Sequence, residues 1–376
     1  MRILFPTFLL VYLGVSFLVI FHMMDVLKPF KFRYVLLVVY IVFSLAMILG
    51  RGLSSFIPLE LGAMISRLGY IWVGLLTFSL VWSLTFILLR HFQIGPVADR
   101  SRLILFGVEL ILCALLLMIG YKNSYDVKVV QHTISNDKGI NLRAVQITDV
   151  HLGYMNSEKQ FSKIVDQINS LNPDIVFITG DFLENENSYA VKKNIGASIN
   201  RLNPKLGIWA VNGNHEYIAG IKESEDYIKH LGIKMLSDTT TFVNDDILLI
   251  GREDPAKTWR TNKPPLPFEQ ILAQKINNEL SVKDVIPEKL TILLVHQVKN
   301  HAIYENMDID LVISGHTHAG QFFPWTLVVK KVYDIPYGLV KRGKSYFYVS
   351  GGAGVWGPAM RLGTKSEIVL FEMESE

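Results

Sequence analysis

Hydrophobic runs dominate the first third of the chain. Four of them, at roughly 3–24, 34–50, 70–89 and 103–121, approach the length of about 20 apolar residues that crosses a bilayer as a helix. The first run is long, lacks a small-residue cleavage site and is followed by further runs, so it differs from a signal peptide. We therefore predict a transmembrane region with four helices at residues 1–121, and an integral protein of the plasma or inner membrane.

After this region the pattern changes to short β-type runs that alternate with helical stretches. The runs are LRAVQIT, DIVFIT, GIWAV, DILLIG, LTILLV, DLVIS and SYFYVS, and SEKQFSKIVDQINSL is the clearest helix between them. Strands that alternate with helices indicate an α/β domain. We place a linker and the first strand at 122–139 and the α/β domain at 140–376. The proline-rich segment 254–289, which contains the helix-like FEQILAQKINNEL, is typical of an insertion or lid.

Charge separates the two regions and gives a predicted orientation. Residues 1–121 carry 9 Lys and Arg against 4 Asp and Glu, and the remainder carries 28 against 30. A slightly acidic domain excludes nucleic acid as the expected partner, because phosphate binding needs a basic face. The loops after the first and third helices hold three basic residues each: Lys28, Lys31 and Arg33, then Arg90, Arg100 and Arg102. The opposite side holds five: Arg2, Arg51, Arg67, Lys122 and Lys128. The positive-inside rule, applied to six basic residues against five, places the α/β domain on the extracytoplasmic side.

Two residues inside the fourth hydrophobic run, Cys113 and Glu109, bear on the compartment and on the packing of the helices. The only cysteine, Cys113, lies within it, so disulfides give no information on the compartment. Glu109 is the only acidic residue inside a predicted span. A carboxyl group at that depth must be neutral, paired or directed into a cavity, so Glu109 is a functional candidate. The alternative is a protonated glutamate bonded to a neighbouring helix, for example at Ser83 or Thr85.

Polar clusters follow five of the predicted strands directly. They are Asp149-Val150-His151, Gly180-Asp181, Asn212-Gly213-Asn214-His215-Glu216, the single His296, and Gly315-His316-Thr317-His318. Alone, each cluster is as well explained by a turn or a core histidine. Together they lie where α/β folds place ligands, at the carboxyl ends of strands. Carboxylates, imidazoles and an amide suit Mn, Fe or Zn rather than Ca, so the set predicts a transition-metal centre.

The order D-x-H, G-D, G-N-H-E, H and G-H-T-H resembles the calcineurin-like metallophosphoesterase superfamily over about 140–372. The four spans and the closing YVSGGAGVWGPAMRLGTKSEIVLFEM are similar to its membrane-bound bacterial subgroup, whose members resemble UDP-2,3-diacylglucosamine hydrolases and cell-wall-associated phosphoesterases. This resemblance implies an α/β metallophosphoesterase domain, in which two β-sheets form a sandwich flanked by helices. It also implies two divalent transition-metal ions, with manganese as the first choice and iron or zinc as alternatives.

The resemblance further implies a role for each polar residue. Asp149, His151 and His318 would hold one ion, Asn214, His296 and His316 the second, and Asp181 would bridge both. His215 would face the substrate as a catalytic residue and would not ligate metal. Arg361 has two open interpretations, a phosphate contact or an exposed structural arginine.

These residues predict a membrane-anchored hydrolase of phosphoric esters or anhydrides, in which a hydroxide that bridges two metal ions attacks the phosphorus. Its expected partners are the lipid bilayer and a lipid-linked or envelope phosphate, because four helices exceed what an anchor needs. In GQFFPWTLVVKKVY we expect three aromatic residues to enter the membrane interface and two lysines to meet anionic head groups: Phe322, Phe323, Trp325, Lys330 and Lys331. The alternative is that these residues cover the edge of a sheet or dock on the helices. The alternatives are a phosphodiesterase for soluble nucleotides and a phosphate-sensing membrane scaffold.

Overall fold

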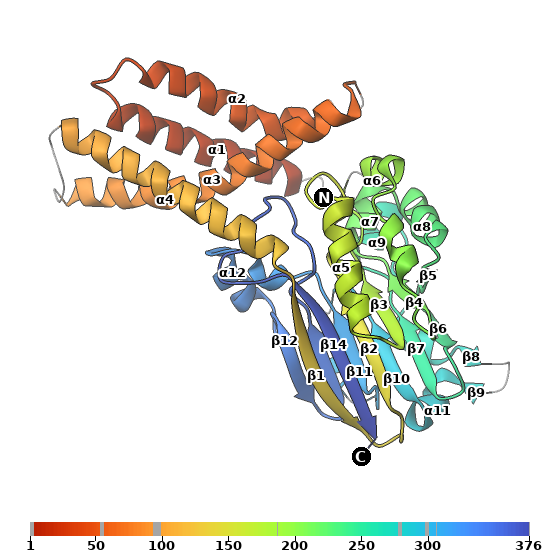
Figure 1. Ribbon diagram of the computed structural model, residues 1–376. Helices are drawn as coiled ribbons and strands as arrows, with labels where there is room; N and C mark the ends of the chain where they lie inside the picture. The colour runs from red at the N-terminus through yellow and green to blue at the C-terminus, as the bar shows by residue number, and fades with distance from the viewer. Residues whose placement is uncertain are drawn as a thin grey trace. The chain divides into compact units, whose positions relative to one another are not determined.

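The computed structural model of the protein describes residues 4–52, 56–92, 99–185, 187–276, 280–297, 301–305 and 307–375. The chain divides into two compact units (Figure 1). The helical unit comprises Met1–Lys122 together with Gly357–Met360, and the α/β unit comprises Asn123–Trp356 and Arg361–Glu376. The two units are described separately below.

The helical unit contains the four long apolar helices that the sequence predicts. They are α1 (Leu4–Val26), α2 (Arg33–Gly52), α3 (Leu59–His91) and α4 (Asp99–Tyr125). Each holds a stretch long and apolar enough to cross a membrane. The expected third helix, 70–89, was too short: α3 has 33 residues and begins just after Pro58, a residue well suited to precede a helix. At about 1.5 Å per residue, α3 is longer than the ~30 Å hydrocarbon core.

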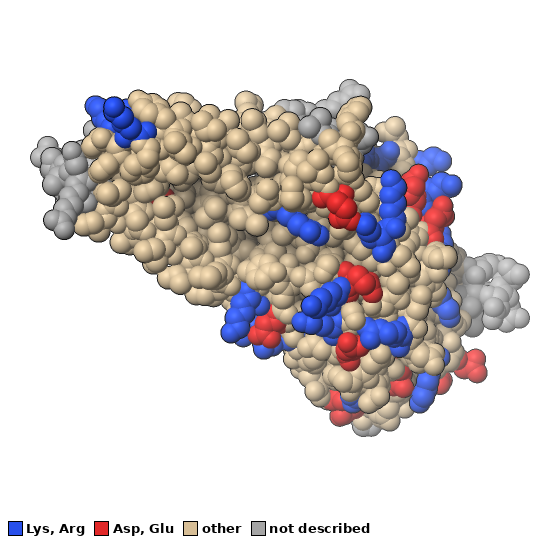
Figure 2. All heavy atoms as spheres, turned by 45° about the horizontal axis from the view of Figure 1, so that its top comes forward, with Lys and Arg blue, Asp and Glu red and all other residues tan. Residues whose placement is uncertain are grey.

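Polar side chains lie inside this otherwise apolar unit. The Tyr12 hydroxyl donates to the Ser44 carbonyl oxygen at 2.8 Å. Glu109 is buried, and its hydrogen-bonding neighbour is Ser79 on α3. The partner thus comes from a neighbouring helix, as the alternative interpretation had it, but it is Ser79 and neither of the two residues given as examples, Ser83 and Thr85. Figure 2 shows that the visible face of the helices carries few charges, whereas Lys, Arg, Asp and Glu are mixed over the α/β unit.

Two mixed six-stranded sheets form the α/β unit, as predicted. The first has the order β1-β14-β2-β3-β4-β5 and the second the order β12-β13-β11-β10-β7-β6. The first sheet consists of β1 (Lys128–Asn136), β2 (Leu142–Ile147), β3 (Ile175–Thr179), β4 (Ile208–Val211), β5 (Lys234–Met235) and β14 (Glu367–Ser375). The second consists of β6 (Thr239–Phe242), β7 (Ile247–Gly251), β10 (Leu290–Leu294), β11 (Leu311–Ser314), β12 (Gly338–Arg342) and β13 (Ser345–Val349). β1 lies within the segment 122–139, for which the sequence interpretation had a linker and the first strand, and it pairs with β14 along its whole length.

A shared hydrophobic core joins the two sheets. It contains Phe177 and Trp209 from the first sheet and Leu249 and Ile292 from the second. The helices of this unit are α5 (Glu158–Ser170), α6 (Asn187–Lys193), α7 (Asn214–Ala219), α8 (Ile221–His230), α9 (Ala256–Thr261), α10 (Phe268–Leu272), α11 (Val282–Val285) and α12 (Trp325–Val332). In α5, residues at helical spacing face the sheet, and Ser157 caps the helix through a capping box with Gln160.

Segment 254–289 is part of the fold and not a lid. Phe268 and Ile271 from α10 and Val282 from α11 lie in a second core, with Leu248 and Ile250 of β7. The expected long helix is also wrong, because α10 ends at Leu272 and is followed by β8 (Lys275–Ile276) and β9 (Leu280–Ser281). Its apolar residues pack against the second sheet, an interaction that local periodicity does not reveal.

Parallel pairing brings the strand ends together. β2, β3 and β4 are parallel neighbours in the first sheet, and β7, β10 and β11 are parallel neighbours in the second. Their carboxyl ends therefore lie at one edge of each sheet. The five polar clusters of the sequence all follow these strands.

Candidate metal centre

Five loops carry the candidate site, and each begins where a strand ends. Asp149 and His151 follow β2, Asp181 follows β3, and Asn214 and His215 follow β4. His296 follows β10, and His316 and His318 follow β11. Within the described part of the chain, possible metal ligands form three overlapping groups: first Asp149, His151 and His318; second Asp181, His296 and His316; and third His151, Asp181 and His215. Six of the seven predicted ligands thus come together with His215.

The first group has the spacing of ligands around one ion. The Nε2 atoms of His151 and His318 are 3.1 Å apart. Oδ1 of Asp149 lies 3.3 Å from His318 Nε2 and 3.9 Å from His151 Nε2. Ligands about 2.1 Å from a transition metal lie about 3.0–3.4 Å from one another in tetrahedral or octahedral geometry. The three side chains need only small adjustments to bind the same ion.

The second group contains a direct indication that a cation belongs there. Nδ1 of His296 donates to the Thr179 carbonyl oxygen at 2.8 Å, which leaves the lone pair of Nε2 free. This buried Nε2 has no hydrogen-bond partner and lies 3.1 Å from Oδ2 of Asp181. A lone pair and a carboxylate at this distance repel unless a proton or metal ion lies between them. The residues therefore fit a metal shared between His296 and Asp181.

Asn214 is the ligand that those groups do not include. Its side-chain oxygen accepts a hydrogen bond from Gln297 Nε2 at 3.3 Å, and the same Gln297 nitrogen also donates to Asp254 at 2.9 Å. The next residue, His215, donates its backbone N–H to Asp181 at 2.8 Å. Asn214 is thus held beside the second group by Gln297 and by the bonding of its own loop.

The backbone of these loops is unusual. Five of the seven predicted ligands have positive φ: Asp149, His151, Asp181, His316 and His318. Such conformations are costly for residues with a side chain and concentrate at functional sites. Two motif glycines permit close approach, since a Cβ atom on Gly213 would lie 2.1 Å from Asp181 Oδ1, and one on Gly315 would lie 2.2 Å from Thr148 Oγ1. The sequence motifs therefore encode the conformation as well as the ligands.

Burial and charge set the protonation of the imidazoles. Burial lowers the pKa of His151 to about 4 and the pKa of His318 well below its usual value, so both rings are neutral and able to ligate metal. Burial also disfavours a proton on His296 and His215, but the nearby carboxylates together outweigh it, with Asp181 contributing most in both cases. The pKa of His296 is raised well above its usual value, and the pKa of His215 is raised to about 9. His215 is thus a cation at neutral pH.

Known proteins with similar sequences identify the family. A model of the calcineurin-like phosphoesterase family matches residues 142–320. A metallophosphoesterase from Campylobacter jejuni is 34% identical over 279 residues, which are 73% of this chain and 71% of that protein. The chain belongs to the calcineurin-like metallophosphoesterase family. Its members hydrolyse phosphoric esters with divalent metals, so the predictions of a metal-dependent hydrolase and of the family are confirmed.

Relatives also support the assignment of a membrane protein. A Danio rerio protein named transmembrane protein with metallophosphoesterase domain is 30% identical over 329 residues, which are 79% of this chain and 72% of that protein. A Helicobacter pylori metallophosphoesterase is 35% identical over 62% of this chain and 60% of its own length. Together with the four apolar helices, the name of the Danio rerio protein supports a membrane-bound phosphoesterase. The likeness to UDP-2,3-diacylglucosamine hydrolases stays a prediction.

Glu184 is a functional candidate that the sequence motifs did not reveal. It lies three residues after Asp181, and its Oε1 atom is 3.1 Å from Nδ1 of His215. Its other oxygen is 3.8 Å from Nδ1 of His151. The buried carboxylate therefore holds the His215 ring and directs Nε2 of that ring toward the metal site. The sequence feature that could have indicated Glu184 is an acidic residue three positions after the G-D motif.

Replacing Glu184 by Gln is expected to lower kcat about 10- to 100-fold while the metal content stays near that of the wild type. The amide keeps a polar contact but loses the charge that holds His215 protonated. Turnover of a chromogenic phosphodiester and elemental analysis check this expectation. Glu305→Gln, an acidic residue in the same unit paired with Arg342, is the control. Equal turnover in both variants would contradict a positioning role for Glu184.

Glu216 belongs to the G-N-H-E motif but had no predicted role. Its Oε2 atom accepts the backbone N–H groups of Asp181 at 3.0 Å and Gly213 at 2.8 Å, and its Oε1 atom accepts that of Leu183 at 2.9 Å. One buried carboxylate thus fastens the loop after β3 to the loop after β4. It holds Asp181 and Asn214 at a fixed separation.

Arg361 is structural, but it is not exposed as the sequence interpretation had it. The side chain is fully buried and donates to the carbonyl oxygens of His318, Gly351 and Gly354 at 3.3, 2.6 and 2.8 Å. These bonds fix the loop after β13 against the loop that carries His318. Because the guanidinium group donates to these backbone carbonyl oxygens, it is directed at the loops rather than at a substrate phosphate.

Proposed function

We propose that this membrane phosphoesterase binds two divalent transition-metal ions, manganese first and iron or zinc as alternatives, and hydrolyses a lipid-linked or cell-envelope phosphate ester or anhydride. Asp149, His151 and His318 would hold one ion, and Asn214, His296 and His316 the other, with Asp181 shared. The observation that carries the lipid substrate is the exposed apolar helix α12, which follows the His318 loop. On the loop charges, we place the α/β unit on the extracytoplasmic side.

Two such ions, when bound, supply a nucleophile from water at neutral pH and offset the charge of the phosphoryl group. The protein's own part is positional. Asp181 and the imidazoles fix the ion positions, and Glu184 orients His215. Positively charged His215, whose Nε2 atom lies 3.9 Å from Asp181 Oδ2, is placed to protonate the leaving oxygen. Trp356 lies edge-on to His215 with its ring centroid 6.2 Å away, and about half of its side chain is exposed.

Helix α12 supports a substrate at the membrane surface. None of its residues is buried, and Trp325 and Leu327 are 52% and 58% exposed. Lys330 and Lys331 lie in its last turn, where they suit anionic head groups. Gly320, two residues after His318, packs against Thr326 so closely that a Cβ atom would lie 2.5 Å from the Thr326 Cα. A membrane contact by α12 would therefore bring the bilayer close to the metal loop.

One expected interfacial residue is wrong. Phe322 is buried and bridges to Leu362, whereas the next residue, Phe323, is 52% exposed. The turn before α12 rotates these two adjacent rings to opposite sides. Phe323, Trp325 and Leu327 remain as the apolar contacts that α12 and its preceding turn offer to lipid.

Replacing Trp325 and Leu327 together by Ser is expected to leave turnover of a small chromogenic phosphodiester unchanged. Hydrolysis of a phospholipid or lipid-linked pyrophosphate in vesicles should fall about tenfold or more, because each large apolar side chain contributes about 1.5–3 kcal/mol on burial. Trp259→Ser on α9 removes a comparably exposed tryptophan and serves as the control.

The alternatives give different outcomes in the same assays. A phosphodiesterase for soluble nucleotides would hydrolyse nucleotides faster than any lipid and would be indifferent to the α12 changes. A phosphate-sensing scaffold would show no turnover of the chromogenic diester with added Mn²⁺. Either result would refute the lipid proposal.

A further inference from the structure

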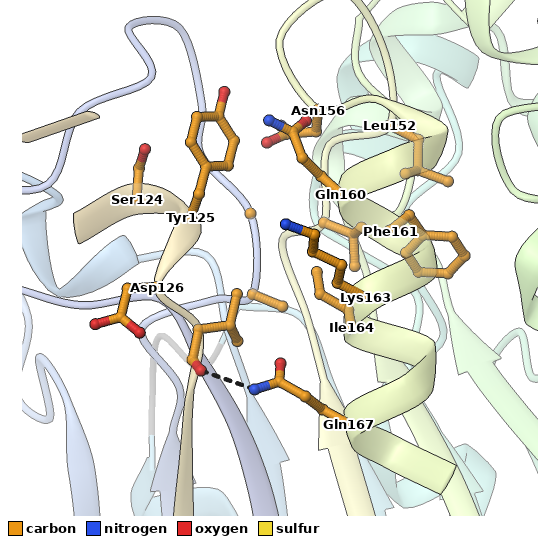
Figure 3. A pocket seen from close by; sticks show the side chains of 14 residues that line it. Ser124, Tyr125, Asp126, Leu152, Asn156, Gln160, Phe161, Lys163, Ile164 and Gln167 are labelled. Carbon is orange, nitrogen blue, oxygen red and sulfur yellow. Dashed lines mark hydrogen bonds between the residues drawn. The ribbon is translucent and has the colours of Figure 1, made fainter. Parts of the chain in front are cut away.

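A pocket of about 280 Å³ lies in the α/β unit (Figure 3), and Val150 and Leu152 of the first metal loop are part of its lining. Ser124, Tyr125, Asp126 and Val127 form one wall, and α5 forms the facing wall with Gln160, Phe161, Lys163, Ile164 and Gln167. Val150, Leu152, Asn156, Ala353 and Gly354 complete the lining. Val150 and Leu152 line the pocket. Asp149, which precedes them, and His151, which lies between them in the sequence, belong to the metal groups instead. The pocket is thus separate from the metal centre.

Two residues that line the pocket also belong to a candidate membrane span. Ser124 and Tyr125 line it and are also the last residues of the span Leu103–Tyr125. The chain therefore places this pocket within a few residues of the point where it leaves the bilayer. Ligand pockets for small molecules usually have about 300–1,000 Å³, so this one suits a head group and not a whole lipid.

The pocket combines an apolar floor with an uncompensated positive charge. Figure 3 shows the side chains of Gln160, Lys163 and Gln167 directed from α5 toward the Ser124–Val127 wall, where Gln167 Nε2 donates to the Val127 carbonyl oxygen at 3.1 Å. Among the described residues no carboxylate lies within ion-pair distance of Lys163. Asp126 is paired with Lys128 at 2.8 Å, and Asp166, three residues beyond Lys163, is paired with Arg201 at 2.5 Å. Lys163 leaves the pocket with a net positive charge.

We propose that this pocket binds the head group of an anionic phospholipid of the surrounding membrane. The Lys163 ammonium group bonds the lipid phosphate, and the Gln160 amide is a second donor near it. Val127, Phe161 and Ile164 contact the glycerol and the first carbons of the acyl chains. This site does not depend on which phosphoester the metal centre hydrolyses.

The bonding of Asn156 links the site to the metal loop. Its Nδ2 atom donates to the carbonyl oxygens of His151 and Val355, each at 2.9 Å. A head group against Asn156, Val150 and Leu152 therefore rests on the backbone that positions His151. Bound lipid would support this backbone.

The test is lipid retention by the full-length protein in detergent micelles, measured by native mass spectrometry with added phosphatidylglycerol or phosphatidylcholine. Lys163→Gln is compared with Lys159→Gln, which removes the same charge one turn earlier on α5, outside the pocket lining. We expect the wild type and Lys159→Gln to retain one phosphatidylglycerol molecule more than Lys163→Gln, whose affinity should be about tenfold lower.

Three results would overturn the proposal. Equal retention of phosphatidylglycerol by both variants would show that Lys163 binds no head group. Equal retention of phosphatidylcholine by the wild type would show that negative charge is not selected. Displacement of the lipid by inorganic phosphate at the same concentration would identify a free anion as the occupant. None of these results depends on hydrolysis, so the proposed function is tested separately.

Discussion

Asp181→Asn is expected to lower the metal content from about two ions per chain to less than one and to lower kcat by at least about 10²-fold. Oδ2 of Asp181 lies 3.1 Å from His296 Nε2 and 3.9 Å from His151 Nε2, so one carboxylate faces ligands of both proposed ions. The asparagine amide removes the negative charge and places an N–H donor or a neutral oxygen between His296 and His151. Both ions lose a ligand, as a bridging position requires.

Elemental analysis and turnover of a chromogenic phosphodiester measure this effect. Asp245→Asn makes the same chemical change at an exposed position and should behave as the wild type. Thermal unfolding of both variants without metal separates ligand loss from misfolding. Two ions per chain and wild-type turnover in Asp181→Asn would exclude the shared-ligand assignment.

The clustering of the candidate metal residues was predictable from the sequence because strand ends fix their location. Each of Asp149, Asp181, His296 and His316 follows a strand whose apolar run is evident in the sequence, and parallel pairing then brings these ends together. The four apolar helices were predictable for a similar reason, since a membrane span is encoded by composition alone.

Other features depend on contacts between distant segments, which periodicity does not report. The contact of Glu184 with His215 spans 31 residues, and that of Gln297 with Asn214 spans 83. The burial of Arg361 could not be predicted, because its hydrogen bonds are accepted by backbone carbonyl oxygens and not by a carboxylate of a sequence motif. Segment 254–289 looked like an insertion because its prolines obscure the apolar residues that enter the second core. Tertiary packing decided all of these positions.

The support around the metal residues also bears on how the site tolerates mutation. Glu216 and Arg361 bond backbone groups of the ligand loops, whereas Glu184 and Gln297 bond side chains of the site. Loss of a loop-fastening residue should disturb several ligands together, and loss of a side-chain partner should disturb one. Variants in these two sets therefore distinguish collapse of the centre from a change in a single group.

His215→Ala is expected to retain both metal ions and to lose about 10²–10⁴ in kcat, the usual scale for an acid–base or electrostatic group. Asp181 and Glu184 outweigh burial and raise the pKa of His215 to about 9, so the wild-type ring carries a proton at neutral pH. Its Nδ1 atom is engaged by Glu184 at 3.1 Å, which leaves Nε2 for the leaving oxygen. The alanine variant leaves the predicted ligands in place but removes this donor.

The leaving group decides whether His215 donates a proton. A nitrophenolate leaves readily without protonation, whereas an alkoxide does not, so His215→Ala should lose much more rate on an alkyl phosphodiester than on a nitrophenyl one. His230→Ala, an exposed histidine at the end of α8, is the matched control and should leave both rates unchanged. Equal losses on the two substrates would assign His215 to charge stabilisation alone, because a positive charge beside the phosphoryl group acts without regard to the leaving oxygen. Wild-type rates on both would remove His215 from the catalytic machinery.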